Sequence, residues 1–97
     1  MTAYFVSRHQ GALDWALEQG IKAQRIAHLD PTQIAAADVV MGTLPIQLAC
    51  AICDKGARYL HLELDLPPEA RGMDLTTADM KRFGARLTAF HIKRIDS

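Results

Sequence analysis

Short apolar runs alternate with helix-forming stretches along the chain, and this alternation limits the possible folds more than any other feature. The runs rich in strand formers are residues 4–6, 26–29, 38–41 and 58–64. The stretches with helical spacing are residues 11–19 and 45–55, and the ambiguous 32–37 fits a helical turn. This order predicts an α/β fold, Rossmann-like, with a mostly parallel sheet and helices on both faces. Because 97 residues leave no room for a second core, we expect one domain over residues 1–97.

Glycines are expected to end the first two helices. Gly20 and Gly56 each follow a helical stretch, and Pro45 suits a first turn. The apolar stripe of the first helix is expected at Ala12, Leu13, Ala16 and Leu17, with Trp15 beside it. The stripe of the second helix is expected at Leu48, Ala49, Ile52 and Cys53.

Period-two alternation makes residues 58–64 the clearest strand. One face carries Leu60, Leu62 and Leu64. The other face carries Tyr59, His61 and Glu63, which we interpret as a polar or interface face.

The last quarter of the chain predicts one helix and one strand. Thr76 and Asp79 have the spacing of a capping box, with Asp in place of the usual Glu. Met80, Phe83 and Leu87 then indicate a final helix. Alternation over residues 90–95 predicts an edge strand.

Ligands of such folds bind beyond the carboxyl ends of the strands, where the strand order reverses. If strands 4–6 and 38–41 are central neighbours, the residues that follow them face each other at that point. The loop after residue 64 lies on the same rim and adds two charged candidates. The predicted binding residues are Ser7, Arg8, His9, Gln10, Gly42, Thr43, Leu44, Pro45, Asp65 and Arg71.

The chemistry of the two loops suits a phosphate or phosphodiester. Arg8 offers a planar fork of donors, and His9 can transfer a proton near neutral pH. Helices that begin after both loops present backbone N–H groups to an anion. The alternative is that Ser7 and Thr43 only cap helices and that His9 is a surface residue. Likewise, Asp65 could cap a turn and Arg71 could be solvated.

The charge balance limits the partners. Lys plus Arg and Asp plus Glu each number 11, so the formal net charge is zero, which argues against a general nucleic-acid binder and favours self-association. The sequence shows no signal peptide and no apolar run long enough for a membrane span, so we expect a cytoplasmic protein.

The thiols and imidazoles predict no metal site and no cofactor. Cys50 and Cys53 form a C-x-x-C, but they lie inside the expected helix, so we interpret them as buried structural cysteines. The four histidines lack ligand spacing, although His28 could reach the rim. Walker-type, G-x-G-x-x-G and G-x-S-x-G loops are absent from the sequence.

Three blocks together resemble a small accessory family of type III CRISPR loci, the stand-alone Csx-type proteins. The blocks are residues 4–12, 42–45 and 56–67. The resemblance implies a Rossmann-like fold related to the domains that sense cyclic oligoadenylate (CARF-like). It also implies a homodimer that binds cyclic tetra-adenylate and acts as a ring nuclease; cyclic hexa-adenylate is the other ring size left open.

On this reading, cleavage needs no metal. The substrate's own 2′-hydroxyl attacks the adjacent phosphorus and leaves a 2′,3′-cyclic phosphate. Catalytic roles fall to His9 as acid or base, Arg8 as phosphate donor, and Ser7 in orienting the phosphate. The alternative function is a sponge that binds cyclic oligoadenylate without cutting it.

Overall fold

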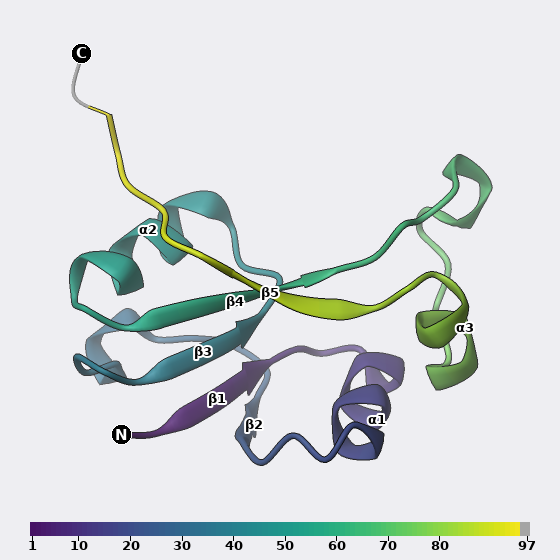
Figure 1. Cartoon of the computed structure of the whole chain (residues 1–97), viewed down its shortest axis with the longest axis horizontal. Coiled ribbons are helices and arrows are strands. Elements are labelled where there is room, and N and C mark those ends of the chain that lie inside the picture. The colour runs from purple at the N-terminus through teal and green to yellow at the C-terminus, as the bar shows by residue number, and fades with distance from the viewer. Residues whose placement is uncertain (96–97) are drawn as a thin grey trace.

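The computed structural model describes residues 1–95, so the last two residues of the predicted 1–97 domain lie outside the description. It contains a five-stranded sheet with the strand order β2-β1-β3-β4-β5 (Figure 1). The strands are β1 (Ala3–Val6), β2 (Gln24–Ile26), β3 (Val39–Gly42), β4 (Arg58–Glu63) and β5 (Arg86–Phe90). Only β5 pairs in the antiparallel sense, with β4. The predicted α/β fold with a mostly parallel sheet is therefore confirmed, and its strand order is one of the common doubly wound orders.

Helices cover both faces of the sheet, as predicted. The α-helices are α1 (Gln10–Glu18), α2 (Ile46–Asp54) and α3 (Thr77–Arg82), and the 3₁₀ turns are η1 (Pro31–Gln33) and η2 (Pro68–Ala70). In Figure 1, α1 and α3 lie on one side of the sheet and α2 on the other. No helix in residues 1–95 is long and apolar enough to cross a membrane.

Two hydrophobic clusters follow from this layering. The first joins the sheet to α2 and is centred on Val40, Ala49, Ile52 and Tyr59. The second joins the sheet to α1 and α3 and is centred on Phe5, Trp15, Met41, Leu62 and Met80. Leu60 and Leu62 of β4 both belong to the second cluster, so they lie on one face of the sheet, as their alternation predicted. Tyr59 corrects the prediction of a polar face, because it is 2% exposed and lies in the first cluster.

The apolar stripe of α1 differs in part from the prediction. Ala12, Trp15 and Ala16 are buried, whereas Leu17 is 67% exposed. The positions i, i+3 and i+4 therefore face the sheet, so Trp15 belongs to the buried stripe and Leu17 does not. Gly20 has a φ of 75° and follows the helix as predicted, and Gly56 with a φ of 89° does the same after α2.

The predicted ends of two strands were wrong. Only Ile26 of residues 26–29 belongs to β2, because the chain bends at 27–28. The final strand spans 86–90 and not 90–95, although its place at the sheet edge was predicted correctly. Gly84, with a φ of 70°, follows α3 after the confirmed Thr76–Asp79 capping box, so Leu87 falls in β5 opposite Leu62.

Candidate functional site

The two predicted loops leave the sheet from neighbouring positions. The register pairs Val6 of β1 with Gly42 of β3, so Ser7 and Thr43 each follow one member of this pair. From here the chain continues into α1 on one face and α2 on the other (Figure 1). This is the point at which the strand order reverses, and β1 and β3 are the central neighbours that our expectation for the two loops required.

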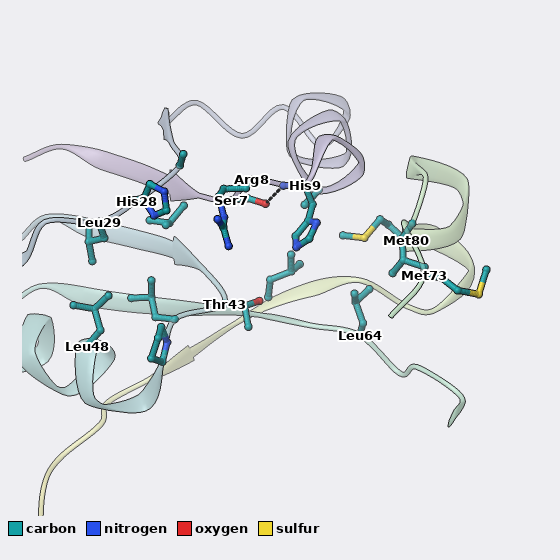
Figure 2. Close-up of a pocket in the computed structure, with 17 residues that line it drawn as sticks. Ser7, Arg8, His9, His28, Leu29, Thr43, Leu48, Leu64, Met73 and Met80 are labelled. Atoms are coloured by element: carbon teal, nitrogen blue, oxygen red, sulfur yellow. Dashed lines mark hydrogen bonds between the residues drawn. The ribbon is translucent and has the colours of Figure 1, made fainter. Parts of the chain in front are cut away.

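A cavity of about 590 Å³ opens at this point, within the range of small-molecule sites (Figure 2). Six of the predicted residues line it: Ser7, Arg8, His9, Thr43, Leu44 and Pro45. His28, which the sequence placed near the rim, also lines it. Figure 2 shows Arg8 and His9 extending from the β1 end toward the Thr43 loop.

The electrostatic character of this cavity differs from that of the whole chain. The chain has a formal net charge of zero, yet none of the described residues that line the cavity is acidic. Arg8 provides a fixed positive charge, and His9 and His28 line the same cavity. A neutral protein thereby concentrates positive charge in one hollow, which attracts an anion.

The helix starts beside the cavity have no side-chain caps. His9 is the N-cap residue of α1 and Pro45 that of α2, and neither makes a capping hydrogen bond. Ser7 Oγ instead accepts from the His9 N–H at 3.1 Å, and Thr43 lies two residues before the N-cap of α2. The alternative in which Ser7 and Thr43 cap these helices is therefore wrong. The uncapped first turns favour an anion at both helix starts.

Gly42 and Tyr59 fix the loop that carries Thr43. Gly42 has a φ of 139°, and a Cβ atom there would lie 2.4 Å from the Val6 carbonyl oxygen. The Tyr59 hydroxyl accepts from the Leu44 N–H at 3.0 Å and lies 2.6 Å from His61 Nδ1. It also lies 3.2 Å from the Gly42 carbonyl oxygen. Burial raises the pKa of Tyr59, so this hydroxyl stays protonated at neutral pH.

We expect Tyr59→Phe to lower the free energy of unfolding by about 1–3 kcal/mol, because the buried Leu44 N–H loses its acceptor. Chemical denaturation measures this change. Tyr4→Phe is the matched control, since Tyr4 is half-buried and packs against the same cluster. If both variants unfold like the wild type, the hydroxyl does not support the loop.

The remaining predicted residues lie outside the cavity lining. Gln10 donates to Asp14 along the exposed side of α1. Asp65 accepts from both Nη atoms of Arg86 at 3.1 and 3.2 Å, which ties the end of β4 to β5 and agrees with a structural role. This carboxylate is also the main cause of the raised pKa of Arg86. Arg71 is exposed just after η2.

The apolar lining on the β4 and α3 side of the cavity was not predicted from the sequence. Five apolar residues from β4, α3 and their connection line this side: Leu62, Leu64, Met73, Leu75 and Met80. Their only sequence signals were the leucine alternation and the helical spacing of Met80, and both indicated core packing. Met73 and Leu75 belong to a connection with no periodic pattern, so nothing in the sequence placed them beside His9.

The two cysteines agree with the structural interpretation. Cys50 and Cys53 are both buried on α2 and are not joined in a disulfide. The Cys53 Sγ accepts from the Ile92 N–H at 3.5 Å, so it packs against the segment after β5. Within residues 1–95, no group of three or more His, Cys, Asp or Glu side chains is arranged to hold a metal ion.

Comparison with known protein families identifies a family that covers most of the chain. The model of a protein family described as "Putative CRISPR-associated protein (Cas_VVA1548)" matches residues 4–93, which is most of the chain. The matched region contains both loops of the cavity and the whole of the sheet except the first residue of β1. No curated protein and no solved structure matches the chain.

Proposed function

Because the chain belongs to the Cas_VVA1548 family of CRISPR-associated proteins, we propose that it is a ring nuclease that degrades cyclic tetra-adenylate, the second messenger of type III CRISPR defence. The observation that carries this proposal is the cavity at the reversal of strand order. It combines Arg8, His9 and two uncapped helix starts, and its described lining contains no acidic side chain. This combination suits a phosphodiester held next to a proton-transfer group.

The compactness of the ligand explains how a neutral chain binds a polyanion. A long nucleic acid needs an extended basic surface, which a formal net charge of zero does not favour. A small ring needs only a few cations at one place, and this chain has such a place in its cavity. The resemblance to Csx-type proteins also implies a homodimer. A two-fold axis would present two copies of the cavity to one ring of four phosphates.

The proposed reaction is an in-line transesterification. The 2′-oxygen of a ribose forms a bond to the adjacent phosphorus, and the bond from phosphorus to the 5′-oxygen breaks. The 2′-hydroxyl gives up its proton, the 5′-oxygen gains one, and the product ends in a 2′,3′-cyclic phosphate. Arg8 and the free backbone N–H groups in the first turn of α2 stabilise the charge on the phosphoryl oxygens. His9 either accepts the proton of the 2′-hydroxyl or donates a proton to the 5′-oxygen, and Ser7 orients the phosphate.

Thermal unfolding with ligand present tests the binding step. Cyclic tetra-adenylate at 100 times its Kd should stabilise the protein by about 2.7 kcal/mol, whereas adenosine at the same concentration should not. Cyclic hexa-adenylate in a parallel sample establishes the ring-size preference. A melting temperature that neither ring changes would contradict nucleotide binding and favour a structural subunit.

A further inference from the structure

We propose that the apolar lining on the β4 and α3 side of the cavity is a subsite for one nucleobase and that Met73 forms its outer wall. This inference rests on the proposed function, because it assigns a part of the same site to the base beside the bound phosphate. We call this side the methionine lobe and define it as Leu62, Leu64, Met73, Leu75 and Met80.

The methionine lobe has a closed floor and an open wall. Met80 is 2% exposed and Leu62 is 9% exposed, so they form the floor. Leu64 and Leu75 are half-buried, and Met73 is 58% exposed although it lines the cavity. Such exposure leaves a flexible apolar side chain in water at the mouth of a hollow. A bound ring would cover part of it and gain the corresponding hydrophobic free energy.

The lobe adjoins the polar part of the cavity. In Figure 2, the His9 imidazole lies between Arg8 on one side and Met80 on the other, with Leu64 below Met80 and Met73 farther from His9. A ligand that fits both parts must join an anionic group to a flat apolar surface. A nucleotide has this division, since its phosphate would meet Arg8 and its base would enter the lobe.

Methionine is suited to the faces of an aromatic ring. The thioether is polarisable and makes favourable contacts with aromatic rings, and its unbranched chain adapts to their shape. Two of the four methionines of the chain lie in this lobe. All five side chains of the lobe are apolar, so it would grip a base by its faces and leave the polar edge of the base toward water.

Close backbone packing holds the lobe beside His9. A Cβ atom at Gly11 in the first turn of α1 would lie 1.8 Å from the Leu75 carbonyl oxygen. Next to Leu75, the Thr76 N–H donates to Asp79 Oδ2 and the Asp79 N–H donates to Thr76 Oγ1. The segment that carries Leu75 is therefore fixed against the helix whose N-cap is His9, and binding requires little reordering of its backbone.

Methionine methyl NMR tests this assignment without a substitution. We expect adenosine 5′-monophosphate to shift the methyl signals of Met73 and Met80 through the ring current of the base, whereas ribose 5-phosphate should not. Met1 is 96% exposed at the opposite end of β1 and serves as the internal control. Equal shifts with both probes, or no shift at Met73 and Met80 with the nucleotide, would overturn the proposal.

A substitution gives the energetic test. Met73→Gln keeps the length of the side chain but removes its apolar end, and it should weaken binding of cyclic tetra-adenylate by about 2- to 10-fold. Met73→Leu should retain most of the affinity, and Leu17→Ala is the control for loss of an exposed apolar side chain. If Met73→Gln binds the ring with wild-type affinity, the base subsite is refuted but the proposed function is not. Failure of the wild type to bind the ring would refute the proposed function, and the NMR test would still decide whether the lobe binds a base.

Discussion

His9→Ala should slow cleavage of cyclic tetra-adenylate by about 10²–10⁴-fold, because the reaction loses its proton-transfer group. The His9 side chain is exposed and makes no capping hydrogen bond, so its removal should leave the melting temperature of the free protein unchanged. Single-turnover cleavage at saturating enzyme measures the effect on the chemical step.

His91→Ala is the matched control for His9→Ala, since His91 is also exposed but follows β5 outside the cavity lining. Arg8→Ala should weaken binding as well as cleavage, because the guanidinium would contact the phosphate before and during the reaction. If His9→Ala cuts at the wild-type rate, the proton passes through another group and the assigned mechanism is wrong.

Gly11→Ala should lower the free energy of unfolding by about 3 kcal/mol, because the new methyl group would overlap the Leu75 carbonyl oxygen. Helix propensity alone predicts the opposite sign, a gain of about 1 kcal/mol. The Leu75 carbonyl oxygen is a backbone atom, so it cannot move aside by a rotation about a side-chain bond. The first turn of α1 and the segment around Leu75 must therefore move apart. Chemical denaturation gives the sign and the size of the change.

Gln10→Ala is the control, since it places alanine at the exposed neighbouring position of the same helix. It should change stability by less than about 1 kcal/mol. Because Gly11→Ala also displaces the methionine lobe from His9, its affinity for cyclic tetra-adenylate should fall. A Gly11→Ala variant more stable than the wild type would show that α1 and the Leu75 segment are not closely packed.

The site residues that could be predicted from the sequence are those that directly follow a strand. Residues 4–6 and 38–41 were recognisable as strands, and the residues after them were expected to face each other if these strands are central neighbours. The structure pairs β1 with β3, and Ser7, Arg8, His9 and Thr43 line one cavity. The same reasoning placed Asp65 on the rim but could not foresee its pairing with Arg86, because we expected the final strand four residues too late.

The site features that could not be predicted from the sequence arise from contacts between residues far apart in the chain. Tyr59 shares its face of the strand with His61 and Glu63, so the pattern indicated a polar face, yet its hydroxyl supports the Leu44 backbone inside the core. Met73 lies in a connection without periodicity, and only the close packing of Gly11 against Leu75 brings that connection to the cavity. Neither contact is local, and neither leaves a spacing that can be read along the chain.

Incubation with labelled cyclic tetra-adenylate, in the presence and absence of EDTA, shows directly whether the protein is a metal-independent nuclease. Chromatography should resolve linear oligoadenylates ending in a 2′,3′-cyclic phosphate, and EDTA should leave the rate unchanged. Recovery of intact ring from a stable complex would contradict the nuclease and identify a sponge. Loss of all cleavage in EDTA would contradict the metal-independent mechanism.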